Sequence, residues 1–171
     1  MIDAKNILSK EFEDLRERII ENHRKAGQLA SGKTIQSMTI EVTNTSGVLY
    51  GRKAFEALET GRAAGSTPKG FREIITQWII DKGIAVEPIP YKRNIKEQLY
   101  TPEQRGLMRL SGAIAHKIKT EGTKLYRSGG RSDIYTPEVK RTVESIMNRL
   151  ADLFMIEIET ITLNSNKDES N

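Results

Sequence analysis

Apolar residues recur at steps of three and four through residues 3–27, a spacing that places them on one face of a long amphipathic helix. These positions are Ala4, Ile7, Leu8, Phe12, Leu15, Ile19 and Ile20. The opposite face is assigned to the charged residues Glu11, Glu13, Asp14, Arg16, Glu17 and Arg18. Gly27 is the expected end of this helix. A helix with a single apolar face has to bury that face, so other elements are expected to pack on it.

The spacing becomes alternating in residues 34–42, which predicts a strand. The residues expected on one face of this strand are Met38, Ile40 and Val42. Residues 44–47, Asn-Thr-Ser-Gly, favour a turn, and residues 48–50 then predict a returning strand and a β-hairpin. A short helix is expected at residues 52–60, closed by Gly61.

Residues 71–79 carry the clearest helical pattern in the chain, with apolar side chains at i, i+3, i+4, i+7 and i+8. These side chains are Phe71, Ile74, Ile75, Trp78 and Ile79. Thr67-Pro68 predicts the start of this helix, and Gly83 predicts its end. The central place of Trp78 in the stripe predicts that its side chain is buried.

Irregular structure and another helix are expected next. Pro88 and Pro90 argue against a helix in residues 84–100. Thr101-Pro-Glu-Gln104 is a capping-box pattern, which predicts the start of a helix that ends near Gly122.

Residues 122–135 contain Ser128-Gly-Gly130 and are expected to form a loop that is mobile until a partner orders it. Thr136-Pro137 predicts the start of the next helix. Its expected inward residues are Val139, Val143, Ile146, Met147, Leu150, Leu153 and Phe154. Residues 155–163, rich in Ile and Thr, predict a closing strand, and residues 164–171 predict a disordered polar tail.

These elements predict an α+β fold. A single domain is expected over residues 1–163, with a small antiparallel sheet packed by the long N-terminal helix and several further helices. The length of 171 residues fits one domain of ordinary size. A hydrophobic content of 37% makes a lean core and leaves apolar surface for a partner to cover.

The sequence contains no cysteine, which excludes disulfides, thiolate metal sites and a cysteine nucleophile. Its uninterrupted apolar runs are too short to predict a membrane span. Residues 1–6 lack the basic and apolar regions of a signal peptide, so a cytoplasmic, reducing environment is the default expectation.

Positive charge is concentrated in residues 105–131, although the net charge of the chain is only +4. This stretch contains one acid, Glu121, and the bases Arg105, Arg109, Lys117, Lys119, Lys124, Arg127 and Arg131. One interpretation is a solvated helix face followed by a loop. The other is a surface that contacts phosphates without reading sequence, because no groove-reading motif accompanies it.

Residues 27–34, Gly-Gln-Leu-Ala-Ser-Gly-Lys-Thr, match the phosphate-binding pattern G-x-x-x-x-G-K-[ST] at every position. That loop binds phosphate when a strand precedes it and a helix follows it. The predicted order here is the reverse, and no predicted strand ends in a magnesium-binding Asp. We therefore interpret residues 27–34 as a helix-to-strand turn, and a nucleotide-binding enzyme is the remote alternative.

The remaining residues do not predict catalysis. His23 and His116 are the two histidines, and neither has the spacing of a metal site. Glu56 and Glu59 would share a helix face, but the bases that flank them favour ordinary surface acids over an acid–base pair. We expect no enzymatic activity, no cofactor and no metal.

Three short segments follow one another along the chain: residues 31–37 (SGKTIQS), 55–62 (FEALETGR) and 65–71 (GSTPKGF). They are similar to the patterns T-G-x-L-x-x-S, Y-x-x-x-x-E-x-G-[TR] (here one residue shorter) and G-x-x-P-x-x-F. In these motifs and in element order, the chain resembles the tail-completion and head-to-tail joining proteins of tailed bacteriophages. It departs from them in lacking an Ala-Pro before the first turn and in a long insertion at residues 84–106.

The resemblance implies a non-enzymatic virion protein, made in the host cytoplasm. Copies would form a closed ring of about six or twelve subunits in the neck or tail, around the DNA channel. The implied partners are portal, neck or tail ring proteins, with transient sequence-independent contact to DNA and no membrane. The Ile-, Lys- and Asn-rich composition fits a phage of an AT-rich host, such as one of the crAss-like group.

The resemblance also leads to two sets of candidate residues. Candidates for the interface between subunits are Glu56, Glu59, Arg62, Phe71, Tyr126, Arg127, Arg131 and Tyr135. Candidates for the side that faces the channel or DNA are Arg105, Arg109, Lys117, Lys119 and Lys124. In a head-to-tail ring, Glu56 and Glu59 would meet bases of a neighbouring subunit. The alternative from another class is a basic protein that binds nucleic acid without sequence preference.

Overall fold

The computed structural model describes residues 4–91 and 99–168, and the chain groups into two compact units. Unit 1 comprises Met1–Ala26, Thr34–Phe55 and Ser132–Asn171. Unit 2 comprises Gly27–Lys33 and Glu56–Arg131. The expected α+β class is confirmed, with a two-stranded antiparallel sheet and a long N-terminal helix that packs against another helix. The single domain expected over residues 1–163 stays a prediction.

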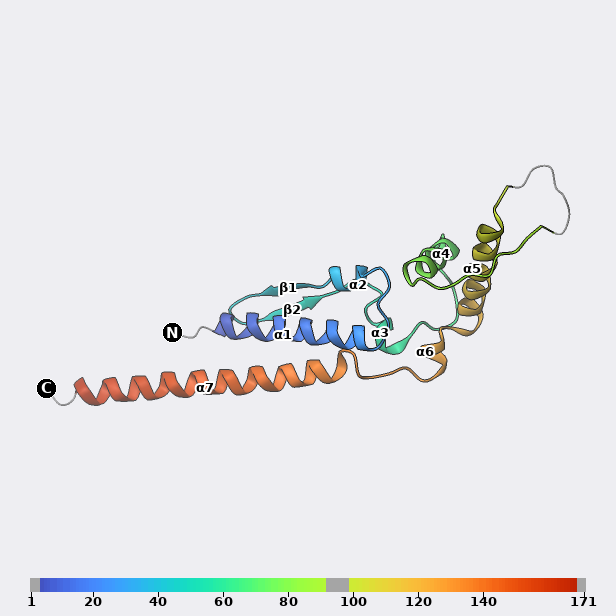
Figure 1. Ribbon diagram of the computed structural model, residues 1–171. Coiled ribbons are helices and arrows are strands. Elements are labelled where there is room, and N and C mark those ends of the chain that lie inside the picture. The colour runs from blue at the N-terminus through green and yellow to red at the C-terminus, as the bar shows by residue number, and fades with distance from the viewer. Residues whose placement is uncertain (1–3, 92–98, 169–171) are drawn as a thin grey trace. The chain divides into compact units, whose positions relative to one another are not determined.

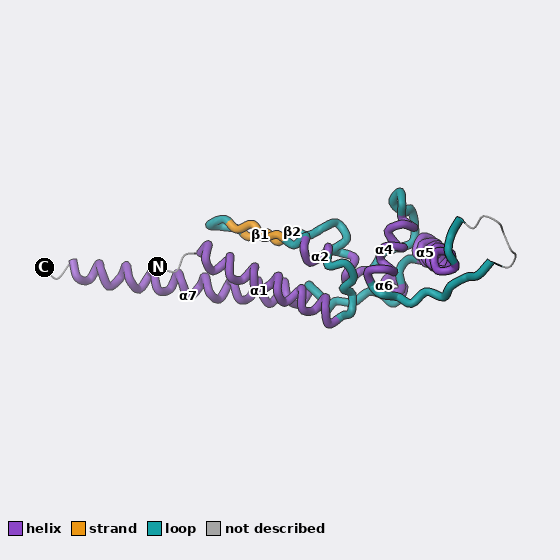
Figure 2. The backbone as a smooth tube through the Cα atoms, turned by 45° about the horizontal axis from the view of Figure 1, so that its top comes forward, coloured by secondary structure: helices purple, strands orange, loops and turns teal. Residues whose placement is uncertain are grey.

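In unit 1, helices α1 (Ala4–Lys25) and α7 (Thr136–Asp168) lie side by side and run antiparallel (Figures 1 and 2). The apolar face that the sequence predicts for α1 is confirmed at its most buried positions, which are Ile7, Leu8, Leu15 and Ile19. Burial of this stripe against α7 and the hairpin described below removes apolar surface from water, which stabilises unit 1.

Glu11 departs from the predicted pattern, because it lies on the packed face of α1 and only 3% of it is exposed. Its Oε1 accepts a hydrogen bond from Ser145 Oγ at 2.9 Å and pairs with Arg149 Nε at 3.0 Å. Arg18, also predicted on the polar face, pairs through Nε with Glu138 at 2.8 Å. A buried carboxylate is tolerated only when it is paired, so these contacts fix which side of α7 faces α1.

A hairpin of β1 (Thr39–Val42) and β2 (Gly47–Tyr50) packs on α1 and confirms the predicted pair of strands. Its register pairs are Thr39–Tyr50, Ile40–Leu49, Glu41–Val48 and Val42–Gly47. A one-turn helix, α2 (Lys33–Gln36), takes the place of the strand expected from residue 34. The first residues after the glycine-containing loop therefore make local helical hydrogen bonds before the chain becomes extended.

The predicted closing strand over residues 155–163 is wrong, because α7 is one continuous helix. Ile and Thr favour strands when a neighbouring strand is present, and the only sheet within the described residues is the β1–β2 hairpin. Thr160 Oγ1 donates to the Ile156 carbonyl oxygen at 2.8 Å, one turn back along α7. Residues 164–168 of the predicted disordered tail are helical as well, and residues 169–171 lie outside the described part of the chain.

The predicted inward face of α7 is only partly correct. Ile146, Leu150 and Leu153 are partly buried, as expected. The exposed residues of the predicted face are Val139, Val143, Met147 and Phe154. The polar contacts of Arg18 and Glu11 turn Thr142 and Ser145 toward α1, which rotates those four apolar side chains away from it.

The described residues of unit 2 form four helices: α3 (Ala57–Thr60), α4 (Phe71–Asp81), α5 (Pro102–Glu121) and α6 (Lys124–Arg127). α4 packs on α5, and α3 packs on α6. The short helix predicted over residues 52–60 is reduced to its last turn, α3. The loop predicted over residues 122–135 is partly helical, because α6 lies within it.

The start of α4 differs from the prediction. Gly70, with φ 72° and ψ 22°, is left-handed and separates Thr67-Pro68 from the first helical residue, Phe71. The buried residues of α4 are Ile75 and Ile79. The predicted burial of Trp78 is wrong, since 38% of it is exposed. The apolar stripe of α4 is wider than the surface that α5 covers.

The capping box that begins α5 is confirmed. Gln104 N donates to Thr101 Oγ1 at 3.2 Å, and Thr101 N donates to Gln104 Oε1 at 2.9 Å. Residues 84–91 are irregular, as the prolines predict, and residues 92–98 lie outside the described residues. The irregular segment crosses α5 at Gly106, where a Cβ atom would overlap the carbonyl oxygen of Glu87.

The α1–α7 ion pair gives a first prediction. Arg149→Ala leaves the buried Glu11 carboxylate without its cation, and we expect the free energy of unfolding to fall by about 2 kcal/mol, because Arg149 is itself partly exposed. Urea denaturation followed by circular dichroism measures the change. Arg141→Ala, an exposed arginine on the same helix, is the control and should cost less than about 0.5 kcal/mol. Equal losses for the two variants would contradict the assignment.

Candidate binding groove

Unit 2 contains an apolar groove of about 690 Å³, a volume typical of sites that hold a ligand or several side chains of a partner. Its apolar walls include Phe71, Ile74 and Trp78 of α4, Ile114 and Ile118 of α5, and Leu125 of α6. The exposure of Trp78 follows from this arrangement, because its indole lines the groove instead of filling a closed core.

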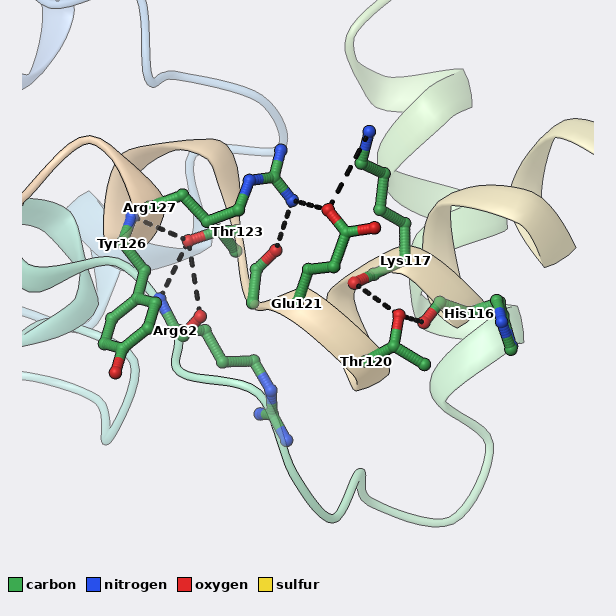
Figure 3. A network of polar contacts seen from close by, with 9 residues as sticks. Arg62, His116, Lys117, Thr120, Glu121, Thr123, Tyr126 and Arg127 are labelled. Carbon is green, nitrogen blue, oxygen red and sulfur yellow. Dashed lines mark hydrogen bonds and ion pairs between the residues drawn. The ribbon is translucent and has the colours of Figure 1, made fainter.

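Two backbone segments that line the groove cross at Gly61-Arg62 and Gly122-Thr123 (Figure 3). Arg62 N donates to Thr123 Oγ1 at 2.9 Å, and Thr123 N donates to the Arg62 carbonyl oxygen at 2.8 Å. Gly61 (φ 70°, ψ −170°) and Gly122 (φ 82°, ψ 178°) occupy a backbone region that is essentially restricted to glycine. A Cβ atom on Gly61 would also overlap the backbone nitrogen of Tyr126. The crossing therefore requires both glycines.

Positive charge surrounds the groove. The cationic residues that line it are Arg62, Lys82, Lys117, Lys124 and Arg127, and none of its described lining residues is a carboxylate. Glu121, just outside, accepts a hydrogen bond from Arg127 Nη1 at 2.9 Å and lies 4.0 Å from Lys117 Nζ (Figure 3). The guanidinium of Arg62 lies 5.2 Å from the centre of the Phe71 ring. One acid among these bases leaves the rim positive, so the groove favours an apolar partner that carries acids.

Gln28 places one polar group in the lining of the groove. Its Nε2 donates to the Leu58 carbonyl oxygen at 2.8 Å. Its Oε1 is buried and has no hydrogen-bond donor among the described residues. A buried acceptor without a donor is unfavourable, so this oxygen is a local cost in the wall of the groove.

The predicted interface candidates are divided between the two units. Arg62, Phe71 and Arg127 line the groove. Tyr126, in α6, is 47% exposed. Tyr135 belongs to unit 1, where its ring centre lies 5.2 Å from that of Phe55.

Glu56 and Glu59 have different environments, although the sequence predicts that they share a face. Glu56 is exposed, whereas Glu59 is only 4% exposed. The backbone N–H of Arg131 donates to the Glu59 carbonyl oxygen at 2.8 Å. The Glu59 side chain is therefore not displayed on the surface of the chain, and contact of either glutamate with a neighbour's base stays a prediction.

The predicted channel-facing bases lie in three places in unit 2. Arg105 donates from Nη1 to the Ile89 carbonyl oxygen at 3.0 Å, and its guanidinium lies 4.0 Å from the centre of the Tyr91 ring. Lys117 and Lys124 line the groove. The two remaining bases of this set, Arg109 and Lys119, are exposed elsewhere on α5. Contact of these bases with DNA stays a prediction.

The phosphate-loop look-alike at residues 27–34 follows α1, so the predicted helix-before-loop order is confirmed. The strand expected immediately after it is wrong, because α2 intervenes. Gly27 and Gly32 have positive φ angles of 64° and 74°, as a turn requires. One helical turn supplies little of the aligned backbone dipole that makes a helix N-terminus bind phosphate.

Neither histidine is among the residues that line the groove. His23 is buried in α1, and His116 is exposed on α5, where its carbonyl oxygen accepts a hydrogen bond from Thr120 Oγ1 at 3.0 Å. Across residues 4–91 and 99–168, no three His, Cys, Asp or Glu side chains gather as they would around a metal ion. Within the same residues, no helix is both long enough and apolar enough to cross a bilayer.

Comparisons with protein families, with curated proteins and with solved structures find no match to this chain. The groove is therefore interpreted from its own chemistry. The sequence patterns did not predict it, and they gave no indication of Gln28 or Lys82. The available signal was the helical stripe of residues 71–79, whose five apolar side chains cover a wider arc than one neighbouring helix can bury.

The glycine crossing gives a second prediction. Gly61→Ala forces a Cβ atom into the Tyr126 backbone, and we expect a loss of about 3 kcal/mol in the free energy of unfolding. Gly83→Ala is the matched control, because Gly83 has a similar φ of 64° but a Cβ atom added there would meet no atom within 4 Å. Its cost should be about 1 kcal/mol, from backbone strain alone. Chemical denaturation of both variants tests this, and equal costs would mean that the crossing is not closely packed.

A third prediction concerns Lys33, which is exposed in the look-alike loop. Isothermal titration calorimetry of the full chain with ATP should show no saturable binding at concentrations up to about 1 mM. Micromolar binding that Lys33→Ala abolishes would establish the nucleotide-binding alternative instead.

Proposed function

We propose that this chain is a non-enzymatic structural subunit that assembles into a homo-oligomeric ring, of the kind that joins head and tail in tailed bacteriophages. The proposed location is the neck or tail of the virion, around the DNA channel. Residues 31–37, 55–62 and 65–71 support it through their resemblance to that family. The second of these motifs also has a physical basis here, since Glu59 is buried and Gly61 permits a close backbone approach.

The observation that carries the proposal is a stripe of exposed apolar side chains along α7. Its members, mostly four residues apart, are Val139, Val143, Met147, Phe154 and Ile158. The exposed fraction of Met147 is 65%. Single exposed apolar residues are ordinary, but a continuous stripe of them favours an interface with another protein. A ring of identical subunits covers the same stripe on every copy.

Sequence-independent binding of nucleic acid remains the second candidate, favoured by the basic stretch of α5 and α6. Arg109, Lys119 and Lys124 are exposed. Against it, Lys117 and Arg127 share Glu121, which lowers the positive potential that a phosphate backbone would meet. Binding to duplex DNA that weakens steeply with salt, by a chain that stays monomeric, would favour this candidate over the ring.

Native mass spectrometry and negative-stain electron microscopy of the purified chain test the ring, and we expect a closed oligomer of defined size. Met147→Asp places a charge in the α7 stripe and should weaken assembly by about tenfold or more. Asn148→Asp adds the same charge at the neighbouring exposed position and should leave assembly unchanged. A monomer at about 100 µM would contradict the proposal, since a ring subunit should associate more tightly than millimolar.

A further inference from the structure

The distal part of α7, residues 150–160, carries apolar side chains around more than one side of the helix. Phe154, Met155 and Ile156 are consecutive, so they point in directions about 100° apart, yet each is more than half exposed. Ile158 is exposed to a similar extent. A flat contact covers one side of a helix only, so this segment, called the α7 tip below, fits a partner that encloses it.

The last residues of the α7 tip, from about 157, also extend beyond α1. The Glu11–Arg149 ion pair fixes the register of the two antiparallel helices, and α1 begins at Ala4, seven residues before Glu11. No described part of α1 therefore lies beside α7 beyond about residue 156. Figures 1 and 2 both show α7 continuing past the amino-terminal end of α1.

The charge of the α7 tip is opposite to that of the groove in unit 2. The tip contains three acids, Asp152, Glu157 and Glu159, and no base. The groove is lined by apolar side chains and five cations, without a carboxylate among its described lining residues. Both surfaces combine an apolar centre with charge at the edge, which is the composition of a specific protein interface.

We infer that the α7 tip of one copy docks in the unit 2 groove of the next copy around the ring. Phe154 and Ile158 enter the apolar groove, and Glu157 and Glu159 lie near the lysines of its rim. The eleven residues of the tip span about 16 Å as a helix, enough to enter a groove of this size. Such a head-to-tail contact joins two different surfaces of identical subunits and closes into a ring when the rotation permits. This inference rests on the proposed homo-oligomeric function.

Engineered cysteines test the contact directly, because the natural chain has none. One full-length variant carries Glu157→Cys and a second carries Lys124→Cys, so the apolar residues of both surfaces stay intact. When the two are mixed under mild oxidation, we expect a disulfide-linked heterodimer, identified by mass. A control mixture uses Thr45→Cys, in the exposed hairpin turn, in place of Glu157→Cys. The heterodimer with Glu157→Cys should form about tenfold faster than the heterodimer in this control. Adding Phe154→Asp to the Glu157→Cys chain should lower the rate of disulfide formation to that of the Thr45→Cys control.

The outcomes separate the inference from the proposed function. Rings by native mass spectrometry with cross-linking no faster than the Thr45→Cys control would overturn the docking and leave the ring standing. A monomer without cross-linking would overturn both.

Two other outcomes would give the groove a different occupant. Cross-linking within a single chain that carries both Glu157→Cys and Lys124→Cys, in dilute monomer, would assign the groove to the chain's own α7 tip. An added mass of a small acidic amphiphile on the unmodified protein would assign the groove to that ligand. Either result overturns the inference.

Discussion

The buried carboxylate of Glu11 is the interaction on which the arrangement of unit 1 depends. Ser145 and Arg149 both bind its Oε1, so α7 has one register and one rotation about its axis relative to α1. A purely apolar contact between two helices would tolerate sliding by a turn, whereas an unpaired buried charge would make that shift costly. The same register turns an apolar stripe of α7 away from α1 and leaves the end of the α7 tip, from about residue 157, beyond α1.

In unit 2, a close backbone crossing has the corresponding role. Gly61 and Gly122 let the segments around Arg62 and Thr123 approach within hydrogen-bonding distance, and both segments line the groove. The apolar side chains of α4 that α5 does not cover are thereby gathered in one concave surface with a positive rim. A lean core and two incompletely covered apolar surfaces follow from the same composition. The proposed association between copies would bury both surfaces.

Features with a local signal were predictable from the sequence. The spacing of α1, the alternation of the hairpin and the capping box at Thr101 each depend on residues close together in the chain. Features set by distant residues were not. Glu11 looks like a surface acid until α7 supplies Arg149, and Arg62 and Thr123 are 61 positions apart. Residues 155–163 have strand-forming composition, but the β1–β2 hairpin is the only described sheet, and the segment is helical.

A cryo-electron microscopy reconstruction of the assembled full chain would decide whether copies join through α7 and the groove, because it shows both the stoichiometry and the path of α7. We expect a closed ring in which the α7 helix of each subunit ends in the unit 2 groove of its neighbour, with Trp78 covered by the incoming Phe154. A chain that remains monomeric, or a ring in which the groove is open to solvent and the α7 tip contacts another surface, would contradict this arrangement.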